Sequence, residues 1–153
     1  MQRRTFLKGS LAASAAGVAA GAGLLVPGTV LADWNKAAFE AKDLSAAMTA
    51  IAGGAGEASA DIKIKAPDIA ENGAVVPVTV STGMAGVESI ALFAAGNGTP
   101  LTSSYNLGEG AEGFVSTRIK MGKTADVVAL VKAGGKLHSA KKEVKVTIGG
   151  CGG

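Results

Sequence analysis

The chain has 153 residues, with 15 lysines and arginines against 12 aspartates and glutamates and a formal net charge of +3. Arg3, Arg4 and Lys8 stand near the start and no acidic residue precedes Asp33, so residues 33–153 hold 12 basic and 12 acidic side chains. This balance removes the excess of positive charge that would argue for nucleic-acid binding, and we expect no nucleic-acid partner. The length that remains after residue 32 suits one domain with a modest core.

Residues 1–32 have the features of a twin-arginine signal peptide. The pair Arg3-Arg4 precedes an uncharged stretch of Ala, Gly, Leu and Val at residues 11–25. Small or apolar residues at positions 30–32, which end with Ala32, suit a cleavage site. The stretch is broken by glycines and is shorter than the span of about 20 residues that crosses a membrane. We therefore expect export by the twin-arginine pathway, cleavage after Ala32, a periplasmic location and no membrane attachment afterwards.

Residues 33–52 have the spacing of an amphipathic helix. Asp33 can cap its start, and Gly53-Gly54 can end it. Apolar residues recur at steps of three or four, which places them along one face: Trp34, Ala38, Ala41, Leu44, Met48 and Ile51. We expect this face to pack against the body of the domain or against a partner chain.

From Asp61 onward the apolar pattern changes to the period of two that is typical of strands. About seven short strands separated by turn signals predict an all-β sandwich, which together with the helix makes up one domain at residues 33–148. The apolar runs are Ile62 with Ile64, Val76 to Val80, Ile90 to Ala94, Leu101 to Tyr105, Phe114 to Met121, Ala125 to Ala133 and Leu137 to Ile148.

Three features of the connections refine this prediction. Gly134-Gly135 predicts a tight hairpin, and residues 96–100 (GNGTP) predict a longer loop. Pro77 has no backbone N–H, so we expect its strand to lie at a sheet edge or to bulge there. An edge strand would offer a place for another subunit to pair.

The only cysteine, Cys151, lies near the end of the chain between two pairs of glycines, Gly149, Gly150, Gly152 and Gly153. Glycine reaches most of backbone space, so residues 149–153 are expected to form a flexible arm. Extended, the arm places Cys151 about 10 Å beyond Ile148, far enough to enter the pocket of another protein. We therefore predict that Cys151 is a site of covalent substrate attachment.

Catalytic machinery is scarce in the rest of the chain. His138 is the single histidine and lies on a lysine-rich strand, which favours a surface side chain. Glu109 and Glu112 fall in a glycine-rich loop, and no cluster of side chains has the spacing of a metal site. We expect no catalytic residue, cofactor or metal. A thiol-dependent enzyme that uses Cys151 and His138 remains an alternative.

Three segments together resemble the SoxY family of thiosulfate-oxidation carrier proteins. They are the tail VTIGGCGG at residues 146–153, the segment IKAPDIAENGAVVPV at residues 64–78, and the twin-arginine leader. The resemblance covers essentially the whole chain. It implies an immunoglobulin-like β-sandwich with an N-terminal helix, and a carrier rather than an enzyme.

The resemblance also implies a cargo and a set of partners. Cys151 would hold inorganic sulfur, first as an S-thiosulfonate formed with thiosulfate by a c-type cytochrome complex. A hydrolase would release sulfate and leave a persulfide, which a sulfur dehydrogenase would oxidise. The family works as a heterodimer with SoxZ.

A terminal Gly-Gly pair leaves one more alternative open. It is also typical of carriers that hold sulfur as a C-terminal thiocarboxylate. Those carriers need ATP-dependent activation and normally work in the cytoplasm, which the predicted signal peptide argues against.

Overall fold

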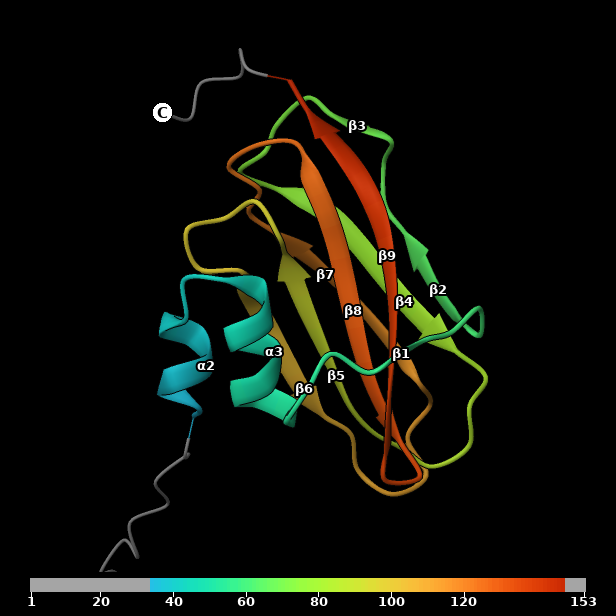
Figure 1. Cartoon of the computed structure of the whole chain (residues 1–153). Coiled ribbons are helices and arrows are strands. Elements are labelled where there is room, and N and C mark those ends of the chain that lie inside the picture. The colour runs from blue at the N-terminus through green and yellow to red at the C-terminus, as the bar shows by residue number, and fades with distance from the viewer. Residues whose placement is uncertain (1–33, 148–153) are drawn as a thin grey trace, which may run out of the picture. The chain divides into compact units, whose positions relative to one another are not determined.

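The computed structural model describes residues 34–147, which contain two helices and nine strands (Figure 1). The predicted signal peptide, Asp33 and the predicted arm with Cys151 lie outside these residues. The elements are α2 (Lys36–Glu40), α3 (Leu44–Ala52), β1 (Glu57–Ala58), β2 (Ile62–Lys65), β3 (Ile69–Ala70), β4 (Val76–Thr82), β5 (Val87–Ala94), β6 (Leu101–Asn106), β7 (Phe114–Ile119), β8 (Ala125–Ala133) and β9 (Lys136–Val146).

The strands form two sheets that face each other, as the sandwich prediction requires. The larger sheet has the order β1-β9-β8-β5-β6, with β3 also pairing to β9, and the smaller has the order β2-β4-β7. The helices α2 and α3 cover the outer face of the larger sheet (Figure 1). The fold is therefore layered as helices, large sheet and small sheet.

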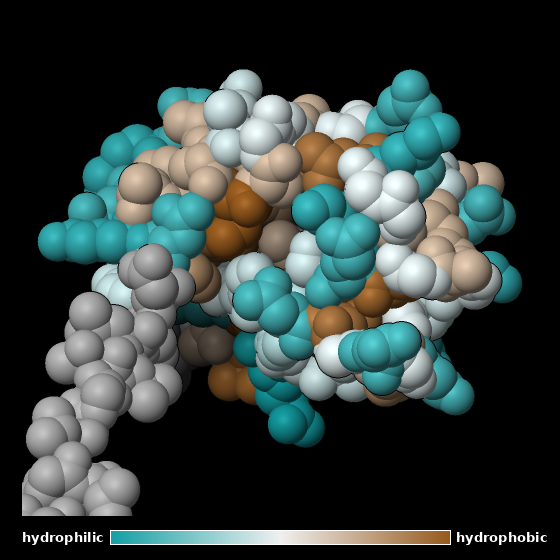
Figure 2. Space-filling model, turned by 90° about the horizontal axis from the view of Figure 1, so that it is seen from below, coloured by the Kyte–Doolittle hydropathy of each residue, from teal (hydrophilic) through white to brown (hydrophobic). Residues whose placement is uncertain are grey.

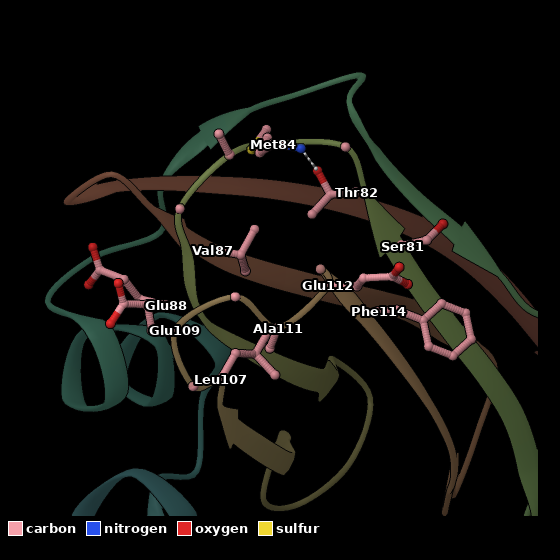
Figure 3. Close-up of a pocket in the computed structure, with 16 residues that line it drawn as sticks. Ser81, Thr82, Met84, Val87, Glu88, Leu107, Glu109, Ala111, Glu112 and Phe114 are labelled. Carbon is pink, nitrogen blue, oxygen red and sulfur yellow. Dashed lines mark hydrogen bonds between the residues drawn. The ribbon is translucent and has the colours of Figure 1, made fainter.

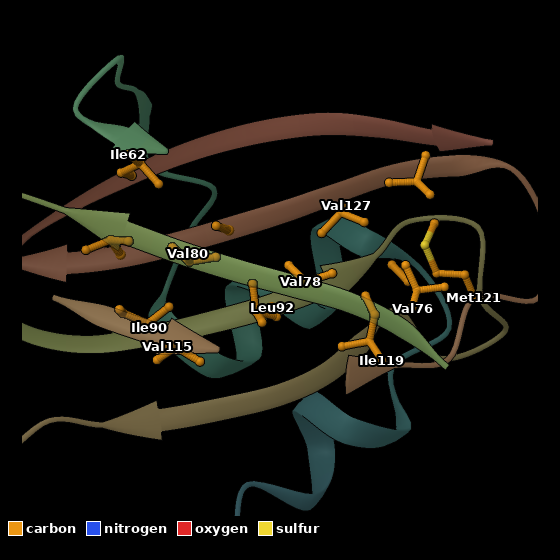
Figure 4. Close-up of a cluster of buried hydrophobic side chains, with 14 of the residues drawn as sticks. Ile62, Val76, Val78, Val80, Ile90, Leu92, Val115, Ile119, Met121 and Val127 are labelled. Carbon is orange, nitrogen blue, oxygen red and sulfur yellow. The ribbon is translucent and has the colours of Figure 1, made fainter. Parts of the chain in front are cut away.

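The two central strands of the larger sheet are apolar on both faces because each face is covered. On β5, Ile90 and Leu92 point into the space between the sheets, while Ala91 and Phe93 point toward the helices. Strand β8 alternates in the same way. Between the sheets, Val76, Val78 and Val80 of β4 complete the core (Figure 4). Each of these valine, leucine, isoleucine and phenylalanine side chains contributes about 1.5–3 kcal/mol when fully buried.

The predicted turns are confirmed. Gly134 and Gly135 join β8 to β9 with φ values of 56° and 75°, the backbone of the tight hairpin turn that glycine favours. Gly53 ends α3 in the left-handed conformation with φ of 86°. Residues 95–100 form the loop between β5 and β6.

The prediction of one continuous helix is wrong, because the chain breaks at residues 41–43. Asn35 caps α2 by accepting the amide of Ala38, and Asp43 caps α3 by accepting the amide of Ala46. Most of the predicted apolar stripe does pack on the sheet. Trp34 is the exception, since 59% of it is exposed.

The prediction that Pro77 lies on an edge strand is also wrong, because β4 is the middle strand of its sheet. Its neighbour β2 ends at Lys65, which lies opposite Thr79, so Pro77 pairs only with Arg118 of β7. The missing N–H is tolerated where the strand has a neighbour on one side alone. The seven predicted strands are present, and the sequence missed the two-residue strands β1 and β3.

Candidate functional site

The described chain ends at Thr147, four residues before Cys151. An extended chain spans at most about 3.3–3.6 Å per residue, so Cys151 stays within about 13–14 Å of Thr147. The surface around the end of β9 is therefore the part of the domain that Cys151 can reach and that a molecule reacting with it would meet. We call this surface the arm base; it comprises residues 66–75, 120–124 and 144–147.

Strand β3 holds the end of β9 from one side. It runs parallel to the end of β9, where the amide of Lys145 donates to the carbonyl of Asp68 at 3.0 Å and that of Thr147 to Ala70 at 3.1 Å. The loop before β8 holds it from the other side, since Oγ1 of Thr124 accepts the amide of Val146 at 2.9 Å. The last described residues of β9, which precede the predicted arm, are thus held in place.

Gly73 lets the chain after β3 pass close to Met121 and to the end of β9. Its carbonyl accepts the amide of Met121 at 2.7 Å. A Cβ at this position would overlap the carbonyl oxygen of Met121 and lie 2.8 Å from Cγ1 of Val146. Only glycine fits between these two neighbours without a shift of the backbone. Sequence reasoning assigned no role to Gly73, although Asn72-Gly73 is a turn signal.

The outer surface of the arm base mixes apolar and charged groups. Ile69 and Val75 are 58% and 49% exposed. Lys142 ties the preceding segment to β9, because its Nζ donates to the carbonyl of Ala66 at 2.6 Å and lies 3.1 Å from Oδ1 of Asp68. The segment at residues 64–78 on which the family resemblance rested therefore includes the strand that holds the end of β9.

His138 lies far from the arm base. It is partly buried near the hairpin end of β9, opposite Val131 of β8 and Glu57 of β1. Nine residues of strand separate it from Thr147, a distance of about 30 Å at 3.3 Å per residue. That exceeds the reach of the four residues to Cys151. The geometry therefore argues against a Cys151-His138 pair within one chain.

A pocket of about 740 Å³ lies at the hairpin end, away from the arm base. It is lined by residues 81–88 and 107–114, with Glu88 and Glu109 together on one side (Figure 3). On this end of the domain, apolar side chains are separated by polar ones (Figure 2). Glu109 and Glu112 are exposed loop acids, as predicted.

Glu88 is engaged with its neighbours rather than available for acid–base chemistry. Its carboxylate lies 3.0 Å from Nζ of Lys132 and accepts the amide of Gly135 at 2.9 Å. The hydrogen bond from Lys132, and then that from Gly135, hold the pKa of Glu88 below its ordinary value. This pocket therefore contains a structural ion pair, and neither cysteine nor histidine is among its lining residues.

Residues 34–147 show neither a metal site nor a membrane-spanning helix. No group of three or more histidine, cysteine, aspartate or glutamate side chains there could hold a metal ion. Neither α2 nor α3 has the length and apolar character that crossing a membrane requires.

Comparisons with known proteins agree on the fold and the family. The profile of a family described as sulfur oxidation protein SoxY matches residues 48–151. The solved structure of the sulfur carrier protein SoxY from Chlorobium limicola f thiosulfatophilum is 44% identical, with a TM-score of 0.63, and the match covers 71% of this chain and 96% of that one. No curated protein matches the chain.

A superoxide reductase (neelaredoxin) from Ignicoccus hospitalis shares the fold alone. It is 24% identical with a TM-score of 0.51, and the match covers 56% of this chain and 80% of that one. This likeness supports the immunoglobulin-like sandwich that the sequence predicted. The family profile covers more than half of the chain, and the Chlorobium structure covers more than two thirds of it at 44% identity. The chain therefore belongs to the SoxY family of sulfur oxidation proteins.

Proposed function

We propose that this protein is a periplasmic carrier that holds inorganic sulfur covalently on Cys151 and presents it to partner enzymes. The observation that carries the proposal is the match of the family profile, which extends to residue 151 and so includes the cysteine. The Chlorobium relative, described as a sulfur carrier protein, supports the same function.

The geometry of the arm base supports this function. A carrier needs a reactive group that leaves the domain from a fixed point, and β9 supplies one because β3 and Thr124 hold its end. A carrier needs no general base of its own, and His138 lies out of reach of Cys151. Partner enzymes therefore supply the chemistry, and this chain supplies the thiol.

The loading step joins the thiol of Cys151 to thiosulfate. The reaction is R–SH + S₂O₃²⁻ → R–S–S–SO₃⁻ + H⁺ + 2 e⁻, in which an S–S bond forms and a c-type cytochrome complex accepts the electrons. A hydrolase then releases sulfate: R–S–S–SO₃⁻ + H₂O → R–S–S⁻ + SO₄²⁻ + 2 H⁺. A sulfur dehydrogenase oxidises the persulfide sulfur, and a further hydrolysis regenerates the thiol.

A second chain of the SoxZ type is the proposed heterodimer partner. In the described region, β6 pairs only with β5 and β7 only with β4, so both strands leave a backbone edge unpaired. Phe114 at the start of β7 is 53% exposed. Purification of the two chains together, followed by size-exclusion chromatography, tests this association; elution as separate monomers would contradict it.

Intact-mass measurement of the protein from thiosulfate-grown cells tests the carrier function. We expect an added S₂O₃ group or a single sulfur, located on the C-terminal peptide and absent from Cys151→Ser. Removal of Gly153 provides the control for the thiocarboxylate alternative, because it shifts the terminal carboxyl group and leaves the thiol intact. An adduct that persists in Cys151→Ser would contradict attachment to the cysteine.

A further inference from the structure

Three lysines from two separate segments gather around a hollow of about 540 Å³ at one side of the arm base. Lys42 belongs to the link between α2 and α3, while Lys120 and Lys123 belong to the loop between β7 and β8. The loop between β5 and β6 supplies the rest of the wall. The full lining is Lys42, Gly96, Asn97, Gly98, Thr99, Lys120, Gly122 and Lys123.

The hollow is held in shape by Asn97, which bridges the two loops. Its Nδ2 donates to the carbonyl of Lys120 at 2.7 Å, and its Oδ1 accepts the amide of Gly122 at 2.9 Å. The two hydrogen bonds use both ends of the side-chain amide, so they fix the β7–β8 loop relative to the β5–β6 loop. The backbone that carries Lys120 and Lys123 is therefore held in place.

The stem of Lys123 lies across Gly96. A Cβ at Gly96 would be 3.0 Å from Cγ and 3.1 Å from Cε of Lys123, and 2.7 Å from Cβ of Ala125. The absence of a side chain at Gly96 thus makes room for the lysine to extend over the β5–β6 loop. Lys123 is directed along the wall of the hollow by this packing.

The positive charge of the hollow is not neutralised by the described residues. No aspartate or glutamate lines it. The ion pairs within residues 34–147 involve Lys36, Lys132, Lys141 and Lys142, and none involves the three lysines of the hollow. The nearest acid in sequence, Asp43, accepts the amide of Ala46 at 2.8 Å as the cap of α3. Clustered unpaired cations in a concave surface attract anions.

The hollow shares Lys120, Gly122 and Lys123 with the arm base. Lys123 immediately precedes Thr124, whose hydroxyl accepts the amide of Val146. The β7–β8 loop and the tip of β9 lie at the same end of the sandwich (Figure 1). Since Cys151 is at most about 13–14 Å from Thr147, a group attached to it can come to this end of the sandwich.

We propose that the hollow formed by Lys42, Lys120 and Lys123 binds a sulfur oxyanion, either free thiosulfate or the sulfonate at the end of an adduct on Cys151. The second source rests on the proposed carrier function. Lysine ammonium groups suit such a ligand, because each is a compact charge with three N–H donors. A sulfonate bound there shields its own S–S bond from thiols in solution.

The test uses chemical loading, which does not depend on partner enzymes. Tetrathionate reacts with the thiolate, R–S⁻ + S₄O₆²⁻ → R–S–S–SO₃⁻ + S₂O₃²⁻, and intact mass verifies the product. In ¹⁵N-labelled protein we expect the amide signals of Asn97, Gly98 and Gly122 to shift on loading. Iodoacetamide, which leaves a neutral group on Cys151, should not shift them.

The two sources of the anion are separated with Cys151→Ser. Shifts of the same amides when thiosulfate is added at constant ionic strength would establish binding of the free ion. Shifts in the loaded protein alone would establish binding of the tethered group. Both results support the proposal. If neither loaded protein nor added thiosulfate shifts these amides, the hollow is not an anion site.

A charge-matched pair of variants gives a second readout. Replacing Lys42, Lys120 and Lys123 by glutamine should make a small thiol release the loaded group several-fold faster. Replacing Lys63, Lys65 and Lys136, three exposed lysines without an ion pair in the described region, removes the same charge elsewhere and should leave the rate near wild type. Equal rates in both variants would overturn the shielding role. Neither result bears on whether the protein from cells carries sulfur, which the intact-mass experiment decides separately.

Discussion

Gly73→Ala should destabilise the domain through the arm base. The added methyl group overlaps the carbonyl oxygen of Met121 and approaches Cγ1 of Val146 to 2.8 Å, so the backbone of one segment must move. Overpacking of this kind costs about 1–3 kcal/mol. If the movement breaks the bond from the Met121 amide to the Gly73 carbonyl, it costs about 1 kcal/mol more. We expect a loss of roughly 2–4 kcal/mol in the free energy of unfolding.

Urea denaturation followed by circular dichroism measures that loss directly, and the thermal midpoint should fall by on the order of 10 °C. Gly108→Ala is the matched control, because a Cβ there meets nothing within 4 Å and its φ is not positive. Amide hydrogen exchange adds a local readout, since the Met121 amide should lose protection. A Gly73→Ala protein as stable as the control, with Met121 still protected, would refute the close approach that we describe.

The other predictions concern the cysteine, the arm and one ion pair. Cys151→Ser should abolish sulfur loading and leave the thermal midpoint unchanged; a large drop in the midpoint would show that the thiol supports the fold. Deletion of residues 149–153 should also change the midpoint little, because the buried core residues of the described region end at Val144. Prolines at Gly149 and Gly150 should slow every transfer to a partner, since proline fixes φ near −65°, and transfer at the wild-type rate would count against a flexible arm. Glu88→Gln should lower the midpoint at neutral pH. Because the pKa of Glu88 is depressed in the folded state, this difference should vanish as the pH falls below that pKa, and a difference that persisted in acid would contradict the assignment.

The strands could be predicted from the sequence because their burial alternates locally. Val76, Val78 and Val80 face the core while Pro77 and Thr79 face outward, so a period of two is visible in five residues. The hairpin could be predicted from the glycine pair at residues 134–135, because the positive φ values that the turn requires are a local property of these residues.

The arm base could not be predicted because it depends on contacts between distant segments. Strand β3 has two residues and pairs with β9 in parallel, about 76 positions along the chain, so it has no periodicity to detect. The break between α2 and α3 was hidden for a different reason. The apolar spacing of three and four residues continues across it, although Asp43 is a typical helix cap.

The pairing of β9 also determines how the domain responds to mechanical load. Strand β9 is hydrogen-bonded to β8 on one edge and to β1 and β3 on the other. A pull on its C-terminal end acts along the strand. The backbone hydrogen bonds between β9 and the antiparallel strand β8 are perpendicular to that force. Many of these bonds must then break together, whereas a peeling force would break them singly. A partner that grips the C-terminal residues and withdraws would therefore load the sheet in its strongest direction.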